Sequence, residues 1–495
     1  MEPAAETPRS PRRRGRGAAF RLAAVLLGLA PFVLAEAACV VFDWGRPDLH
    51  DDPFVGFSGT RRLFVLSDDG SRCEIPPSRQ SFFRPESFDA VKAPGEYRIF
   101  CLGGSTVQGR PFAVETSFTT WLELDLAQAD PGRKWQVVNC GGVSYASYRL
   151  VPVLREVFEY EPDLIVLYTG HNEFLEDREY GHIRDIPAVV RRPLELAAGT
   201  RTFNLLREAA LRLADSAGSR PVLGDEVDAM LDYKGGLAKY HRDETWQRGV
   251  IEHFRSSLAR IVQLCRAAGV RLLLVNPASN LRACPPFKSQ HRDGLSADEL
   301  RRWNDLCRAA GEQLGLNPFR AAALLAEARA IDDRHAGLHF LLGECLEAAG
   351  RHDAAREAYV RAKELDVCPL RMLEPMHEAL LETARRTGTP LVDARALIER
   401  RSEGFAGGYL MLDHVHPSIT GHRLIAEALT DELIRRGIVR PRVGWEARRD
   451  VAARKHLRSL GRFYFAKGRE RLRALRGWAA GRSSFVPPRG DGQAP

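Results

Sequence analysis

The sequence has no CxxC pair and no cluster of cysteine and histidine at the spacing of metal ligands, although it contains nine cysteines. It therefore carries no signature of a zinc site or of a disulfide framework, and we expect neither a metal nor another cofactor. Cys101 and Cys140 fall in segments that are typical of strands, where a small buried thiol is expected. The chain also lacks the composition of a disordered protein, since 44% of its residues are hydrophobic. Its 495 residues are enough for two or three domains.

Positive charge is scarce in the middle of the chain and concentrated at its ends. Residues 1–21 carry a net charge of +4 and residues 441–495 one of +10, which leaves −6 for the middle out of a total of +8. A basic domain that binds nucleic acid is therefore not expected. The pattern favours membrane topology at the N-terminus and contact of the C-terminus with an anionic surface.

The N-terminus has the pattern of a membrane anchor. Six arginines precede an apolar run of 21 residues, 22–42, which is about the length that spans a bilayer. Basic residues before the run predict an N-terminus inside the cell and an extracytoplasmic, periplasmic body. The alternative is a cleaved signal peptide, because Ala35-Glu36-Ala37 has the small-x-small form of a cleavage site. The length of the run favours the uncleaved anchor.

Apolar strands alternate with helical segments in the middle of the chain. Strands are expected at 98–102, 135–140, 164–168, 270–276 and 390–393. This alternation predicts an α/β fold with a parallel sheet that helices cover on both faces. Sites in such sheets lie beyond the carboxyl ends of the strands. The polar residues that follow or end a strand in this way are Ser105, Ser144, Asn172 and Asn276.

Ser105 is the candidate nucleophile, because it follows the first strand after two glycines that permit a sharp turn. Far along the chain, Asp413 and His416 precede Pro417 and an apolar helix at 424–429. In chain order these motifs resemble a divergent GGST branch of the SGNH (GDSL-like) hydrolase family, over roughly 96–176, 250–280 and 387–435.

The resemblance implies a flavodoxin-like three-layer αβα sandwich that hydrolyses or transfers acyl esters. It implies that Ser105 is the nucleophile, that His416 is the general base and that Asp413 orients the imidazole. For the oxyanion hole it implies the N–H of Ser105, an N–H after the second strand and the side-chain amide of Asn172.

Three motifs depart from the family pattern. Gly-Asp-Ser is replaced by Gly103-Gly104-Ser105, so the family's aspartate is missing. After the second strand, spacing favours Ser144 as the oxyanion donor and residue type favours Gly142, so both stay candidates.

The third departure replaces Gly-x-Asn-Asp by Gly170-His171-Asn172-Glu173. We expect His171 to be structural or to face the substrate. His414, beside the candidate base, is expected to be exposed.

About 110 residues between the fourth and fifth strands resemble tetratricopeptide (TPR) repeats. A period of 34 residues, typical of TPRs, relates two stretches of this insertion. The matched pairs are Ala321 with Ala355, Leu325 with Tyr359, Ala328 with Ala362, Ile331 with Leu365, and Asp332 with Asp366. About two repeats are expected, with a helix at 369–387 as a candidate to pack on them. A third hairpin is expected around Leu460-Gly461 and Gly468, which copy the spacing of Leu342-Gly343 and Gly350.

The expected organisation has eight parts. They are a basic cytoplasmic N-terminus (1–21), an anchor (22–42), a linker with small strands (43–95), the first part of a hydrolase domain (96–280, with an insertion at 178–245), TPR-like helices (281–386), the second part of the hydrolase domain (387–440), a basic helical segment (441–480) and a disordered tail (481–495). The insertion contains expected helices at 194–198 and 203–214 and could form a lid or wall over the site.

Three functions are compatible with these features. The leading hypothesis is a membrane-anchored, extracytoplasmic serine esterase or deacylase that acts on an ester-modified glycan or lipid. The second is an acyltransferase that modifies a cell-envelope polysaccharide through the same acyl-enzyme. The third is a scaffold with weak or no catalysis, whose TPR-like helices bind a protein partner.

Overall fold

A computed structural model describes residues 14–42, 44, 52, 54–59, 61–178, 200–203, 205–206, 221–402 and 404–480. The expected helix at 194–198, most of that at 203–214 and the tail from 481 lie outside these residues. The chain forms two units, one of residues 1–53 with 181–220 and one of residues 54–180 with 221–495.

The first unit contains α1 (Arg14–Val41), which includes nearly all of the expected anchor. The carboxylate of Glu36 accepts hydrogen bonds from the backbone N–H groups of Arg201 and Thr202. In the part of the chain that the structure describes, no helix has both the length and the apolar character needed to cross a membrane. The anchor stays a prediction.

The second unit is built on a five-stranded parallel sheet with the order β10-β9-β7-β5-β6. All five expected strands are confirmed: β5 (Glu96–Gly103), β6 (Lys134–Gly141), β7 (Leu164–Tyr168), β9 (Arg271–Asn276) and β10 (Leu391–Asp393). Numbered along the chain, the order is 2-1-3-4-5, which is that of a flavodoxin-like sheet. Every residue of β5, which lies between β7 and β6, is buried, as expected for a parallel sheet covered on both faces.

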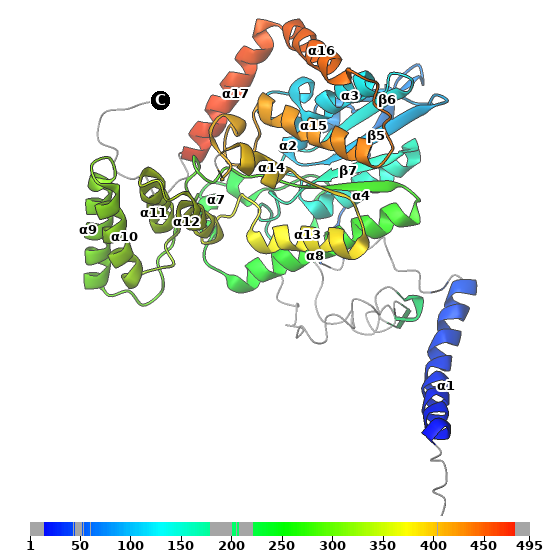
Figure 1. Cartoon of the computed structure of the whole chain (residues 1–495), viewed down its shortest axis with the longest axis horizontal. Helices are drawn as coiled ribbons and strands as arrows, with labels where there is room; N and C mark the ends of the chain where they lie inside the picture. Colours follow the sequence, from blue (N-terminus) through cyan, green and yellow to red (C-terminus); the bar gives the residue numbers. More distant parts are fainter. Residues whose placement is uncertain are drawn as a thin grey trace, which may run out of the picture. The chain divides into compact units, whose positions relative to one another are not determined.

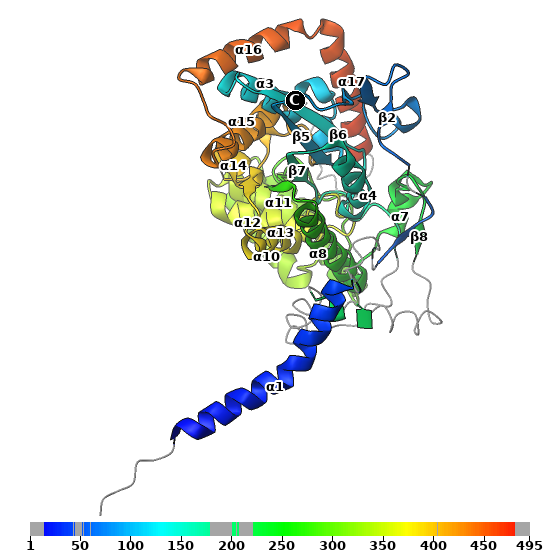
Figure 2. The ribbon, with the colours of Figure 1, turned by 90° about the vertical axis from the view of Figure 1, so that its right-hand side faces the viewer.

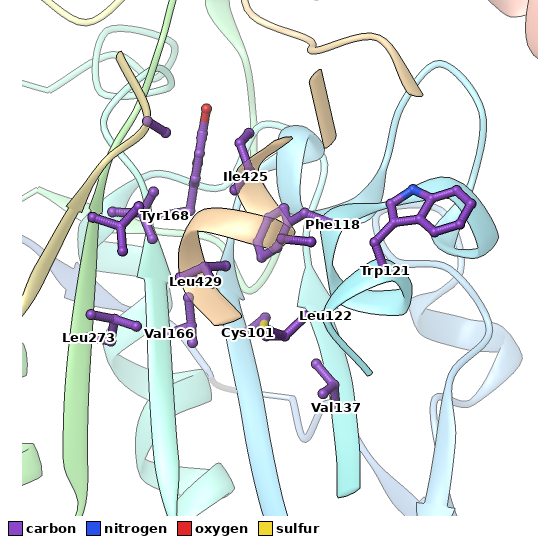
Figure 3. Packing of buried hydrophobic residues seen from close by; sticks show 14 of the residues in the cluster. Cys101, Phe118, Trp121, Leu122, Val137, Val166, Tyr168, Leu273, Ile425 and Leu429 are labelled. Atoms are coloured by element: carbon purple, nitrogen blue, oxygen red, sulfur yellow. The ribbon is translucent and has the colours of Figure 1, made fainter. Parts of the chain in front are cut away.

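Helices form a layer on each face of the sheet (Figures 1 and 2). One layer holds α3 (Phe118–Ala129), α14 (Ala394–Arg401) and α15 (Ile419–Arg435), and the other holds α4 (Ser147–Val157), α8 (Glu244–Ala267) and α13 (Glu374–Thr387). Figure 3 shows how the first layer packs on the strands. Side chains of α3 and α15 meet side chains from β5, β6, β7 and β9, among them Phe118, Leu122, Ile425, Leu429, Cys101, Val137, Val166 and Leu273.

Small strands precede and flank this body, as the linker prediction expected. β2 (Val65–Leu66), β3 (Arg72–Glu74) and β4 (Ser87–Asp89) form an antiparallel sheet. β1 (Gly56–Phe57) pairs in parallel with β8 (Val222–Leu223).

Two helical hairpins lie between β9 and β10. They are α9 (Ala297–Gln313) with α10 (Pro318–Ile331), and α11 (Ala336–Ala348) with α12 (His352–Glu364). Four of the five matched pairs are buried at both positions, namely Ala321 and Ala355, Leu325 and Tyr359, Ala328 and Ala362, and Asp332 and Asp366. The hairpins have their own apolar core. Their assignment as TPRs stays a prediction.

Two helices outside these hairpins differ from expectation. α13 forms where the helix at 369–387 was expected, but it packs on α8 and β9 and so belongs to the α/β body. The motif at Leu460-Gly461 does not copy the repeat, because Leu460 and Gly461 lie between α16 (Trp445–Ser459) and α17 (Arg462–Ala480). Its counterpart Leu342-Gly343 lies inside α11, where Gly343 packs against the ring of Tyr359.

Candidate active site

The sheet register brings the expected site residues to one edge. Gly103, which ends β5, pairs with Gly141 of β6 and with Tyr168 of β7, so the carboxyl ends of these three neighbouring strands are level. Ser105, Ser144 and Asn172 follow these three strands. The chain separates them by up to 67 positions, and the parallel sheet brings them to the same edge.

Ser105 is the first residue of the short helix α2 (Ser105–Gln108), and only 9% of it is exposed. Gly103 and Gly104 are required here by close contacts, because a Cβ at Gly103 would overlap the carbonyl of Tyr168 and one at Gly104 would overlap the amide nitrogen of Asn172. The backbone N–H of Ser105 lies at the start of α2, where it has no acceptor within the helix.

A tight loop before α15 holds Asp413 and His416. One carboxylate oxygen of Asp413 accepts hydrogen bonds from the backbone N–H groups of Val415 (3.0 Å) and His416 (2.9 Å). Met411 and Pro417 form a bridge that closes the loop. These bonds fix the carboxylate beside the imidazole of the same turn.

Ser105, His416 and Asp413 form one hydrogen-bonded chain. The Nε2 atom of His416 is 2.7 Å from Oγ of Ser105, and its Nδ1 atom is 2.7 Å from Oδ2 of Asp413. Burial raises the pKa of Asp413, but the charges of His416 and His414 and the hydrogen bonds from His416 outweigh it, so the net pKa is well below the ordinary value. Asp413 is therefore an anion that can stabilise a positively charged imidazole.

The structure distinguishes between the two candidate oxyanion donors after β6. The N–H of Gly142 donates to the carbonyl of Gly103 at 3.0 Å, so it is occupied, which favours Ser144 over Gly142. Ser144 has a φ of 64°, a left-handed conformation that is uncommon for serine. Its N–H donates to no acceptor among the described residues. The reason for glycine at 142 is packing, because a Cβ there would overlap the rings of Tyr145 and Phe83.

Asn172 lies beside these donors. Its Nδ2 atom donates to the carbonyl of Tyr145 at 3.0 Å, which leaves the second N–H of the amide free to point elsewhere. Since Nδ2 lies against Gly104, the amide is next to the nucleophile. Asn276, by contrast, is not part of the site, because its amide bonds with Asp393 and His377.

Two further histidines lie near His416, of which His171 is buried and His414 is partly buried. Burial lowers the pKa of His171 to about 3, and its Nδ1 accepts a hydrogen bond from the N–H of Met372, which makes it a neutral structural group. The prediction that His414 is exposed is wrong. Its ring stacks on Trp478 of α17 and contacts Phe287 edge-on, and burial lowers its pKa to about 4.

The α17 helix contacts both sides of the site, which sequence reasoning did not anticipate. Tyr464 bonds with Thr116, and Arg471 donates to the carbonyl of Phe112, shortly after the nucleophile helix. Arg476 donates to the carbonyl of Leu412, next to Asp413. The regular apolar positions of this basic helix indicate that it packs on another part of the protein. They do not indicate which surface it covers.

His422 gives a pH-dependent contribution to stability. Burial, helped by the charge of His416, lowers its pKa to about 3, and its Nδ1 accepts a hydrogen bond from the N–H of Phe118. In the unfolded chain His422 binds a proton near pH 6.5, whereas in the folded protein it stays neutral down to about pH 3. The stability that depends on neutral His422 is therefore complete above pH 6.5 and is lost as the pH falls towards 3. We expect His422→Asn to reduce the slope of unfolding free energy against pH by about 1.4 kcal/mol per pH unit between about pH 6 and 4.

Urea unfolding at several pH values measures this slope. His352→Asn is the matched control, because His352 is exposed on α12 and its replacement should leave the slope as in the wild type. Equal slopes for His422→Asn and the wild type would show that His422 is not held neutral by the fold.

No protein-family model and no curated protein matches this sequence. Solved structures do match. They include an α/β hydrolase from the metagenome of Lake Arreo in Spain, with 15% identity and a TM-score of 0.30, which covers 69% of this chain and 96% of its own. An acetylxylan esterase from Geobacillus stearothermophilus has 12% identity and a TM-score of 0.31, and the match covers 70% of this chain and 96% of the esterase. A putative lipolytic protein of the G-D-S-L family from Desulfitobacterium hafniense has 10% identity and a TM-score of 0.30, and the match covers 68% of this chain and 99% of that protein. Similarity at this level assigns no activity to the chain.

Proposed function

We propose that this protein is a serine esterase or deacylase of the SGNH type that acts on ester-linked acyl groups. The observation that supports this most directly is the continuous chain of hydrogen bonds from Ser105 through His416 to Asp413. A hydroxyl, an imidazole and a buried carboxylate at these distances are the groups that nucleophilic acyl transfer requires.

The first half of the reaction forms an acyl-enzyme. Oγ of Ser105 attacks the ester carbonyl carbon while Nε2 of His416 takes the hydroxyl proton, and Asp413 stabilises the imidazolium. The negative oxygen of the tetrahedral intermediate is stabilised by the N–H groups of Ser105 and Ser144 and by the amide of Asn172. The C–O bond to the alcohol then breaks, and the leaving oxygen receives the proton from Nε2.

In the second half, the ester between Ser105 and the acyl group is cleaved. Water gives a proton to Nε2 of His416 as its oxygen attacks the acyl carbon. The second tetrahedral intermediate collapses, the acid leaves, and Oγ of Ser105 regains its proton from Nε2.

Transfer to a sugar hydroxyl is the alternative fate of the same acyl-enzyme. The groups at the site serve both reactions, since an acceptor hydroxyl replaces water in the second half. An ester-bearing envelope glycan or lipid as substrate, a periplasmic location behind the N-terminal anchor, and a protein partner on α9–α12 stay part of this proposal.

A fluorophosphonate probe tests the assignment of the nucleophile. We expect the wild type to be labelled at Ser105, Ser105→Ala to remain unlabelled and His416→Ala to label far more slowly, because an unactivated serine hydroxyl is a weak nucleophile. Ser459→Ala is the control, because Ser459 is exposed at the end of α16. Equal labelling of all four proteins would refute the proposal.

Turnover of a chromogenic ester separates the two reactions. A burst of one equivalent of alcohol followed by slow release would indicate transfer, whereas steady release in water would indicate hydrolysis.

A further inference from the structure

Buried arginines in this protein are generally paired with carboxylates. Arg98 bonds with Glu96 at 2.8 Å, and Arg149 forms a buried pair with Glu176 at 2.5 Å. Such pairing is expected, because an unpaired charge is costly to bury.

Three half-buried arginines beside the nucleophile depart from this pattern: Arg84, Arg110 and Arg471. None of them forms an ion pair with a residue that the structure describes. The Nε atoms of Arg84 and Arg110 are buried without a hydrogen-bond partner there, and Arg471 donates to the carbonyl of Phe112 at 3.0 Å. Guanidinium N–H groups are therefore left with donor capacity that no described residue uses.

Backbone and side-chain contacts bring the segments of these arginines together near Ser105. The N–H of Arg110 donates to the carbonyl of Ser105 at 3.2 Å, which places Arg110 directly after the nucleophile helix. The side chain of Gln108 donates to the carbonyl of Phe82 at 2.8 Å and so holds the segment of Arg84 against α2.

The same carbonyl of Phe82 accepts the N–H of Val143 at 2.8 Å, beside the candidate oxyanion donor Ser144. Arg471 comes from α17, which packs closely on Phe112 because Gly468 leaves room for that ring. The three arginines thus come from three segments that converge next to the candidate active site.

The three side chains act on one another electrostatically. Burial lowers the pKa of Arg84, and the charges of Arg471 and Arg110 lower it further. Burial and the charge of Arg471 likewise lower the pKa of Arg110. The carboxylates within electrostatic range do not neutralise the cluster, since Asp413 is bound to His416 and Glu115 is exposed.

We infer that Arg84, Arg110 and Arg471 bind an anionic group, a carboxylate or a phosphate, on the ester that Ser105 attacks. This inference rests on the proposed esterase function and narrows its substrates to esters that carry a nearby negative charge. The planar guanidinium group suits both anions, because its N–H groups match two oxygens at once. The cluster also gives the basic segment at 441–480 a role at the site itself.

Matched ester pairs test the inference by kinetics. The pairs are mono-para-nitrophenyl glutarate with para-nitrophenyl valerate, and para-acetoxybenzoate with its methyl ester. They place the charge on the acyl side or on the alcohol side. We expect the wild type to favour the anionic member of at least one pair by about tenfold or more in kcat/KM, and added salt to weaken that preference.

Variants locate the preference within the cluster. Arg84→Gln and Arg471→Gln should each lower the anionic-to-neutral ratio of kcat/KM by about tenfold. Arg473→Gln, on the exposed side of α17, should keep the ratio of the wild type. The two cluster variants lie on different segments, so a failure of α17 to dock in one is not shared by the other, and melting temperatures identify such a failure.

Binding to Ser105→Ala gives a readout that does not need turnover. Glucuronate, inorganic phosphate and uncharged glucose are titrated by calorimetry. Binding of glucuronate alone indicates that the substrate carries a carboxylate sugar, and binding of phosphate alone indicates that it carries a phosphate group. In both cases the double variant Ser105→Ala, Arg471→Gln should bind the anion more weakly. Absence of anion binding together with absence of charge preference would overturn the inference, even if neutral esters are hydrolysed and the esterase proposal stands. Absence of probe labelling with intact anion binding would instead remove the esterase proposal and leave an anion site.

Discussion

Replacement of Asp413 by asparagine should lower kcat by about 10⁴-fold, which corresponds to about 5.5 kcal/mol in the barrier. The two backbone N–H groups of Val415 and His416 point at Oδ1, so the amide of asparagine would place its oxygen there. Its NH₂ group would then face Nδ1 of His416, at the position where Oδ2 now lies 2.7 Å away.

This exchange changes the tautomer of the imidazole. Nδ1 must accept a hydrogen bond from the asparagine, so the proton moves to Nε2, and Nε2 can no longer take the proton of Ser105. Steady-state hydrolysis of an activated ester measures the loss. KM should change little, because the substituted group does not contact the substrate.

Asp431→Asn is the control for this substitution, because Asp431 is exposed on α15 and its replacement should leave kcat unchanged. A loss of less than tenfold in Asp413→Asn, at an unchanged melting temperature, would show that Asp413 does not set the tautomer of His416.

The sheet could be predicted well from the sequence because its strands are short, apolar and bounded by turns. β5 and β7 are buried at every position, and the apolar runs at 99–102 and 164–168 within them differ clearly from the amphipathic helices around them. The pairing of Asp413 with His416 was also accessible, since three residues of spacing place both side chains in one turn. Only the assembled fold shows that this turn meets Ser105, whose Oγ is 2.7 Å from His416.

Features that depend on distant packing could not be predicted. The burial of His414 requires Trp478, which α17 brings back to the site from the end of the chain. The distinction between Gly142 and Ser144 requires the hydrogen bond from Gly142 to Gly103, which depends on strand register. Local residue type carries no information on either contact.

Asn172→Ala should lower kcat by about 10²–10³-fold, or about 2.7–4 kcal/mol, with a smaller effect on KM. The amide of Asn172 lies against Gly104, and the carbonyl of Tyr145 fixes one of its two N–H groups. The other N–H is therefore already oriented when the carbonyl oxygen of the substrate becomes negative. A donor held in place in this way acts mainly on the transition state and not on the bound ester.

Asn304→Ala controls for loss of an asparagine side chain, because Asn304 is exposed on α9. Asn172→Asp supplies a second comparison, since it keeps the size of the side chain and replaces its N–H donors by oxygen. It should be at least as damaging as alanine, because a carboxylate would repel the oxyanion as well as fail to donate. If both variants of Asn172 keep the kcat of the wild type, the oxyanion is held by the N–H groups of Ser105 and Ser144 alone, and the left-handed conformation of Ser144 becomes the feature on which stabilisation of the intermediate depends.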